Sequence, residues 1–310
     1  MPDLYPDVRE ALMTLRAVML ILVAALGGSL FAQGMSEDYV DARTEEKFSK
    51  NHGFSFEWDV YGYIPWFEQQ QRVRSGGIGS DAVSYTKDMD GFPIGFFGGT
   101  ELRFRFSWHD SIEAGYNLYY TRAFKDELDD FTRWNGLIYP PNTDIDYGSD
   151  FHDFHILYRR DLFRLGLSKN ITFFVKAGLE YSYIRTNVGS DNFPAVDDKD
   201  VETFRELFPW YTAGFGAEIE IGQSFRITAE ARATYEVGFP TFQRRDKNDM
   251  KQSIWSLTGL VNFNWNITDW FSLVVNVHYR YLRVRLYGGF RQDNFLWYSV
   301  GPDIGFGLRF

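Results

Sequence analysis

The chain has 310 residues, no cysteine and a formal net charge of −10. This charge argues against nucleic-acid binding, and the lack of cysteine excludes disulfide frameworks and thiolate metal sites. Aromatic residues make up 19% of the chain, yet the mean hydropathy of −0.32 is too polar for a bundle of membrane helices. Aromatic and polar residues are therefore expected to alternate locally.

The N-terminal segment predicts export. Arg16 precedes an apolar stretch from Ala17 to Leu26, and small residues follow as far as Ala32. This layout is typical of a signal peptide, and the apolar stretch is too short to favour a membrane anchor. We assign residues 1–32 to a signal peptide with Met13 as an alternative start, 33–52 to a periplasmic segment and 53–310 to the folded domain.

Apolar residues recur at every second position in ten segments of the folded domain. A period of two places apolar side chains on one face of a strand and polar side chains on the other. Several segments are longer than the 5–6 residues usual for soluble strands and long enough to cross a bilayer, which takes about 9–11 tilted residues. The segments are 54–66, 94–108, 112–120, 154–158, 171–183, 211–221, 225–239, 255–267, 271–281 and 296–310.

The last two segments carry further information. After Tyr281 the alternation slips by one residue, which predicts a β-bulge. The final segment, LWYSVGPDIGFGLRF, is apolar at every second residue up to the terminal Phe310. A terminal aromatic after such alternation resembles the insertion signal that the outer-membrane assembly machinery recognises. We therefore predict this role for Phe310, with that machinery as a partner.

The connections between segments alternate in length. Short turns with long loops on the opposite side are the signature of outer-membrane barrels. We expect an all-β, transmembrane antiparallel barrel in the bacterial outer membrane, with ten strands and a polar lumen; the weak pattern of 154–158 leaves eight strands as the alternative. Short turns are expected at 108–111, 165–170, 222–224 and 266–270, and long loops at 70–91, 125–149, 187–206, 239–251 and 287–295.

The polar half of the alternating pattern is expected to face the lumen. It mixes acids and bases, and the lumen of a ten-stranded barrel is narrow enough for side chains to fill. Because unpaired buried charges are costly, we expect an ion-paired plug, with a selective pore as the alternative. The predicted network comprises Glu57, Glu101, Arg103, Arg105, Glu180, Glu218, Arg226, Glu230, Arg232 and Arg280.

Two of the predicted outer loops carry residues suited to binding or chemistry. The acidic loop before segment 154–158 leads to His152 and His155, a combination able to bind a cation or activate water, although a solvated acidic loop is the simpler interpretation. A later loop carries Arg244, Arg245 and Lys247, which suit lipopolysaccharide phosphates or a host polyanion. We expect no cofactor and no metal site of the protein itself, and lipopolysaccharide and a divalent cation stay open as ligands.

Four fragments, LDDFTRWNG, DFHDFHILYRRDL, VKAGLEYSYIRTN and LFPWYTAGFGAEIEI, resemble the omptin-fold group of outer-membrane proteases and adhesins. The resemblance extends over most of 53–310 and implies ten strands with five outer loops. Omptin proteases hold water between an Asp pair and an Asp-x-His pair, so the resemblance points to Asp130 and Asp249 as catalytic carboxylates. The corresponding fourth loop, GFPTFQRRDKNDMKQ, has no histidine, and the family's general base is therefore missing.

The sequence favours a non-enzymatic surface protein in the lipid bilayer, with a plugged lumen and a structural or adhesin-like role carried by its charged loops. An omptin-like aspartyl protease and a porin-like channel for small solutes are the alternatives. Loop carboxylates close to a histidine would favour the protease, and a continuous water path would favour the channel.

Overall fold

The computed structural model describes residues 54–63, 66–74, 83–84, 96–107, 109–122, 126–127, 131–134, 137–165, 170–189, 201–222, 224–235, 251–288 and 291–310. These residues belong to a compact unit that spans Asn51–Phe310. The predicted signal peptide and most of the predicted periplasmic segment belong to the other unit, and both lie outside the described residues. Among the described residues, no helix has the length and apolar character needed to cross a membrane.

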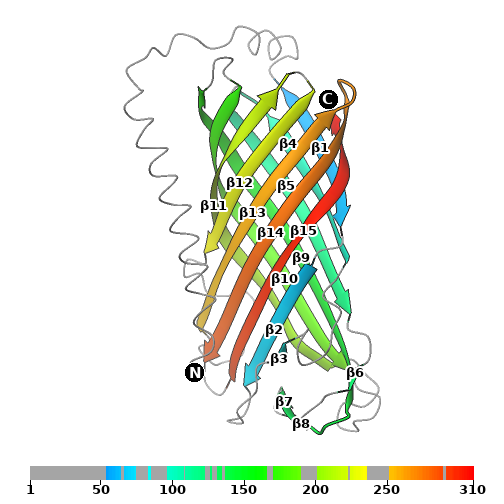
Figure 1. Ribbon diagram of the computed structural model, residues 1–310. Helices are drawn as coiled ribbons and strands as arrows, with labels where there is room; N and C mark the ends of the chain where they lie inside the picture. The colour runs from blue at the N-terminus through cyan, green and yellow to red at the C-terminus, as the bar shows by residue number, and fades with distance from the viewer. Residues whose placement is uncertain are drawn as a thin grey trace. The chain divides into compact units, whose positions relative to one another are not determined.

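The long strands form one closed antiparallel barrel (Figure 1). Each long strand pairs with its neighbour in chain order, and the first also pairs with the last, which closes the barrel. β1 and β2 follow one another along the same side of β15 and so count as one strand of the barrel. The barrel therefore has the ten strand positions that the alternation predicts. Its strands are β1 (Ser55–Tyr63), β2 (Trp66–Arg74), β4 (Phe96–Arg105), β5 (Asp110–Arg122), β9 (Asp144–Leu165), β10 (Ile171–Gly189), β11 (Val201–Ile221), β12 (Phe225–Tyr235), β13 (Lys251–Asn266), β14 (Phe271–Gly288) and β15 (Arg291–Arg309).

The interruption between β1 and β2 coincides with two prolines in the sequence. Both strands pair with β15 in a single register, because Gly62 lies opposite Ile304 and Trp66 lies opposite Val300. Midway between these pairs, β15 contains Pro302, and the sequence between β1 and β2 contains Pro65. Proline has no N–H to donate to a sheet ladder, so an interruption of the pairing at this level is expected.

Tight turns join the strands at one end of the barrel, the short-turn end, at the top of Figure 1. Between β4 and β5, the Ser107 hydroxyl donates to Asp110 Oδ2 at 2.7 Å. Gly222 has a φ of +64°, a left-handed conformation that glycine adopts without strain. Before β14, the amide of Phe271 donates to Thr268 Oγ1 at 3.0 Å. All four predicted short turns connect strands at this end.

The opposite end, the long-strand end, differs from the prediction. The weakly patterned fourth segment is β9, a strand of 22 residues, and β11 has 21 residues. The loops predicted at 125–149 and 187–206 are therefore partly strand. The prediction of a long loop at 287–295 is wrong, because β14 ends at Gly288 and β15 begins at Arg291. Four short strands lie among these connections: β3 (Val83–Ser84), β6 (Asp126–Glu127), β7 (Thr132–Trp134) and β8 (Leu137–Tyr139).

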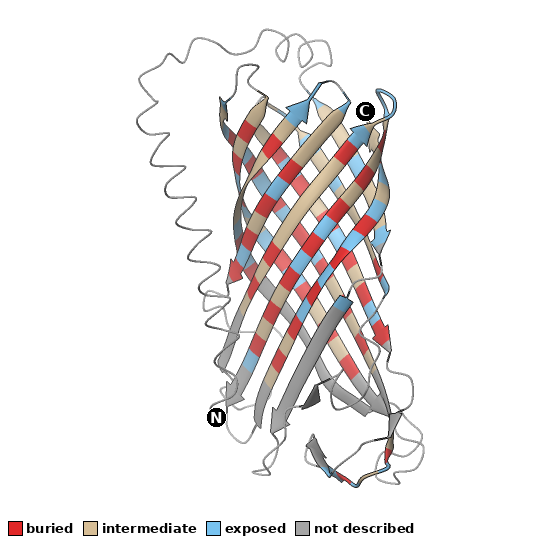
Figure 2. Cartoon of the chain, viewed as in Figure 1, coloured by how far each residue is buried: buried red, intermediate tan, exposed pale blue. Residues whose placement is uncertain are grey.

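Side-chain exposure alternates along the strands (Figure 2). On β9, Phe154, Ile156 and Tyr158 are exposed on the outward wall, whereas His155 and Arg159 are buried in the lumen. An apolar wall around a polar interior reverses the arrangement of a soluble barrel and matches one that faces lipid. The predicted assignment of the apolar face to lipid agrees with this geometry.

The pattern on β14 changes after Tyr281. Leu282 and Val284 point inward and are fully buried, while Arg283 and Arg285 take outward positions. The pairing of β14 with β13 and β15 continues here without a shift in register, so the predicted bulge is wrong. Side chains continue to alternate between inward and outward positions, but from Leu282 onward the inward residues are apolar and the outward residues include arginines. An apolar interior with a charged wall is the pattern of a barrel surrounded by water, and this level therefore marks where β14 leaves the lipid.

Candidate functional site in the barrel lumen

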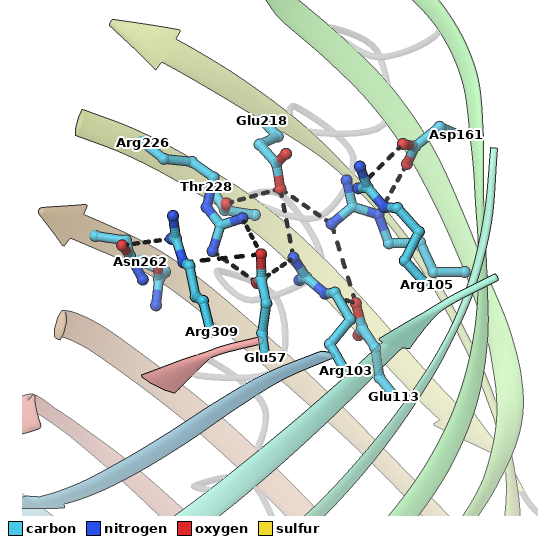
Figure 3. Close-up of polar contacts among 12 residues, drawn as sticks. Glu57, Arg103, Arg105, Glu113, Asp161, Glu218, Arg226, Thr228, Asn262 and Arg309 are labelled. Carbon is cyan, nitrogen blue, oxygen red and sulfur yellow. Dashed lines mark hydrogen bonds and ion pairs between the residues drawn. The ribbon is translucent and has the colours of Figure 1, made fainter. Parts of the chain in front are cut away.

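A cluster of charged side chains around Glu57 lies in the lumen near the short-turn end (Figure 3). Arg226 donates to both carboxylate oxygens of Glu57, with Nη1–Oε1 at 3.1 Å and Nη2–Oε2 at 2.9 Å. Arg103 lies 3.5 Å and Arg309 3.9 Å from the same carboxylate. These four residues come from β12, β1, β4 and β15, so the cluster joins the wall on opposite sides of the barrel.

A second group of ion pairs lies beside the first. Arg103 Nε donates to Glu113 at 2.8 Å, and Arg159 Nη1 donates to Glu218 at 3.1 Å. Lys176 Nζ lies 2.5 Å from the other oxygen of Glu113. A buried charge is tolerated when it is paired and hydrogen-bonded, and this interlocking provides such partners. Asp161 extends the group by pairing with Arg159 at 2.9 Å and Arg105 at 3.6 Å, and Glu230 by pairing with Lys176 and with Arg232 at 3.2 Å.

Arg280 forms the next polar level toward the long-strand end. Its two terminal nitrogens donate to Asp153 at 2.6 Å and to Glu180 at 2.7 Å. Ser182 donates to the same Asp153 at 2.9 Å. The guanidinium also lies over the ring of Phe151, 4.7 Å from its centroid, in a cation–π contact. Arg280 therefore connects the ion-paired part of the lumen to the aromatic part.

An aromatic cluster lies in the lumen beyond Arg280. Trp297 packs edge-on against Tyr119 and Phe151, with ring centroids 4.5 Å away in both cases. Tyr119 and Phe151 stack on each other at 5.1 Å, and Phe97 lies 4.2 Å from Tyr119. These four rings come from β15, β5, β9 and β4 and are at most 3% exposed. The cluster therefore packs like the interior of a soluble protein.

Inward glycines make room for large side chains next to the wall. A Cβ on Gly216 would collide with the ring of Phe174, and one on Gly115 would collide with His155. The guanidinium of Arg159 lies over the ring of Phe174, 3.9 Å from the ring centroid. Large inward side chains therefore pack directly against glycine backbone.

All ten predicted network residues lie on inward positions of their strands, and nine of them take part in the ion pairs above. The tenth, Glu101, lies opposite Asp59 and Gly115 in the sheet register. Sequence reasoning missed Arg159 and Asp161 because the apolar side of the fourth segment was too short to establish its phase. The available signal was the run of alternate positions Asp153, His155, Leu157, Arg159 and Asp161, in which Leu157 alone is apolar.

The two histidines predicted for loop chemistry are not brought together. His152 and His155 lie on opposite faces of β9: His152 is on the wall, where Tyr116 Oη lies 2.7 Å from its Nδ1, and His155 is buried in the lumen. The predicted carboxylates and the predicted basic loop lie outside the described residues: Asp130, Asp249, Arg244, Arg245 and Lys247.

The predicted insertion residue, Phe310, closes the barrel. Its amide and carbonyl exchange hydrogen bonds with Phe56, both at 2.9 Å. The Phe310 side chain is exposed on the wall. The end of the chain is therefore part of the seam between the first and last strands.

A closed antiparallel barrel with an apolar wall, charged side chains in its lumen and short turns at one end defines an integral outer-membrane β-barrel protein. The chain is similar to solved outer-membrane barrels. The Escherichia coli outer-membrane protease OmpT is 10% identical over 83% of this chain and 97% of its own, with a TM-score of 0.47.

Two further structures show the range of similar barrels. The Pseudomonas aeruginosa outer-membrane protein OprG is 13% identical over 83% of this chain and 95% of its own, with a TM-score of 0.31. The Yersinia pestis attachment invasion locus protein Ail is 9% identical over 82% of this chain and 98% of its own, with a TM-score of 0.27. No protein-family model and no curated protein matches the sequence.

Proposed function

We propose that this protein is a surface barrel with a closed lumen, which binds partners through the loops at its long-strand end. The observation that carries this proposal is two levels of packed side chains in the lumen, first ion pairs and then aromatic rings. Ten-stranded barrels are narrow, and open aqueous channels are typical of barrels with about 16 strands. Side chains packed at both levels favour a plug over a channel for small solutes.

The orientation follows from the two ends of the barrel. Short turns face the periplasm in barrels of this class, so the long-strand end faces the outside. The exchange of polar and apolar faces after Tyr281 supports this orientation, because the strands continue into water beyond it. The protein thus holds its loops above the membrane on a rigid base.

Omptin-like proteolysis receives less support from the described residues. The two histidines suggested for this chemistry point to opposite faces of the barrel strand β9, His152 to the outer wall and His155 into the lumen. A general base must reach the proton it removes within hydrogen-bond distance, directly or through one water. A proteolytic role would require Asp130 and Asp249 to act with a different base.

A binding assay on the refolded protein tests the proposed loop function. Immobilised heparin serves as the polyanion probe, and we expect the triple variant R244Q/R245Q/K247Q to lose most of the wild-type retention, with a weaker dependence on salt. The variant R160Q removes one exposed positive charge at the short-turn end and serves as the control. Equal retention of the wild type and the triple variant would contradict binding through this loop.

A further inference from the structure

Two buried hydrogen-bond donors near the short-turn end of the lumen have no acceptor among the described residues. They are Nε of Arg226 on β12 and Nδ2 of Asn264 on β13, and these two residues lie opposite each other in the sheet register. Asn264 is fully buried, and its side-chain oxygen accepts a hydrogen bond from Arg309 Nη2 at 2.8 Å. A buried polar group without a partner is rare in native proteins, and a bound water or ion is one explanation of it.

The surroundings of these donors carry more positive than negative charge. Arg226 and Arg309 lie on one side of Glu57, and Arg103 lies on the other (Figure 3). Arg103 also pairs with Glu113 at 2.8 Å, whereas Arg309 has no carboxylate closer than 3.9 Å among the described residues. On their side of Glu57, Arg226 and Arg309 therefore share a single carboxylate.

The next acid along β1 does not pair with these arginines. Asp59 lies one level further into the lumen beside Gly307, where an added Cβ would collide with the side chains of Asp59 and Ser272. Within the described part of the chain, Asp59 forms no ion pair with an arginine or a lysine. Arg226, Asn264 and Arg309 therefore offer more donors and more positive charge than the acceptors around them use.

Solvent reaches this group from the short-turn end. The side chains of Arg309 and Glu57 are each 21% exposed, whereas those of Arg159 and Glu218 in the adjoining ion pairs are 0% and 5% exposed. The backbone N–H of Arg309 donates to the carbonyl of Trp270, in the turn before β14, which places Arg309 at the end of the barrel. A small solute can therefore approach Arg309 without passing the ion pairs further in.

We infer that a small oxyanion, a phosphate or carboxylate group, binds between Arg226, Asn264 and Arg309. A guanidinium group donates parallel hydrogen bonds to such a group, and the free N–H of Asn264 adds a further donor beside it. An oxyanion also brings the negative charge that Arg309 lacks, whereas a water molecule brings none. The site lies at the opposite end of the barrel from the loops and is independent of what they bind.

The urea midpoint of the refolded barrel in uncharged detergent tests this inference, with inorganic phosphate replacing chloride at constant ionic strength. A ligand that binds only the folded barrel raises the midpoint with the logarithm of its concentration, once this exceeds the dissociation constant. We expect that rise for the wild type. Asn264→Asp keeps the acceptor for Arg309 and puts a carboxylate oxygen in place of the free N–H, so this variant should fold and show no rise.

Arg309→Gln is a second variant, which removes the charge but keeps a donor for Asn264. Because it loses a charged hydrogen-bond partner of the anion, its rise should begin at a phosphate concentration about tenfold higher or more. The control is R160Q, which removes an exposed arginine that pairs with Asp110 at 3.3 Å at the same end, and it should respond as the wild type does. Heat-dependent gel mobility reports the midpoint and verifies that each variant has folded.

Acetate is the second probe in the same assay. A rise with both probes assigns the site to oxyanions in general, and a rise with one of them assigns it to that group. Equal rises for the wild type, Asn264→Asp and Arg309→Gln would overturn the inference, because the anion would then bind elsewhere. The absence of any rise in the wild type would also overturn it and would leave the two donors to water.

Discussion

At the scale of single residues, Arg280 joins the ion-paired part of the lumen to the aromatic part. It pairs with Asp153 and Glu180, and it stacks on Phe151 at the border of the aromatic cluster. All three partners are buried. Removing one member of a buried ion pair leaves its partner as an uncompensated charge, which costs more than the pair contributes.

We therefore expect Arg280→Met to lower the free energy of unfolding by about 3–5 kcal/mol. The loss should appear as a shift of the urea midpoint, measured by heat-dependent gel mobility of the barrel in detergent. The matched control is Arg160→Met, an arginine on the exposed wall that also pairs with an aspartate. Because solvent screens that pair, its removal should leave the midpoint nearly unchanged. Equal shifts for the two variants would show that the lumen network does not stabilise the fold.

The aromatic cluster allows a second test at this scale. Trp297 contacts both Tyr119 and Phe151 and is 3% exposed. Trp297→Ala should lower the free energy of unfolding by about 3–5 kcal/mol, because it opens a cavity among rings that cannot close around it. Trp265→Ala, on the exposed wall, is the control for loss of a tryptophan. A lumen with loosely packed rings would instead tolerate Trp297→Ala with little change in the urea midpoint.

At the scale of elements, alternation predicted the number of barrel positions and the outward face, because the period of a strand is independent of tertiary context. Strand ends were harder to predict. β14 and β15 continue nearly to their connection, since polar residues such as Arg285 and Asn294 occupy outward positions in water, where polarity does not distinguish strand from loop. The apparent slip after Tyr281 has the same cause. Beyond this residue the outward positions become polar and the inward positions apolar, although the pairing register does not shift.

The pairing of β1 with β15 gives a prediction about assembly. Phe310 joins the last strand to Phe56 through two backbone hydrogen bonds, while its side chain is exposed on the wall. If Phe310 is the insertion signal, Phe310→Ala should reduce the fraction of protein recovered in outer membranes, although its backbone bonds can still form. Phe306→Ala, another outward aromatic of β15, is the control. The insertion role would be contradicted by equal recovery of both variants in fractionated membranes.

At the scale of the whole molecule, the lumen explains why so much charge can reside within a membrane protein. The inward positions of nine of the described strands supply acids and bases that pair with one another within 4.0 Å, and the aromatic rings pack beyond them. Nine of the ten predicted network residues take part in these pairs because alternation specified their face. Their individual partners could not be predicted, since these depend on strand stagger and on side chains that reach across the lumen.

Planar-bilayer conductance of the refolded wild-type protein tests the central claim most directly. A lumen closed by the Arg280 pairs and the Trp297 cluster should give no stepwise current, at either sign of the applied voltage. The double variant R280M/W297A, which weakens both levels, should give more frequent openings than the wild type if it folds. Regular stepwise conductance of the wild-type protein would contradict the closed lumen and support a channel instead.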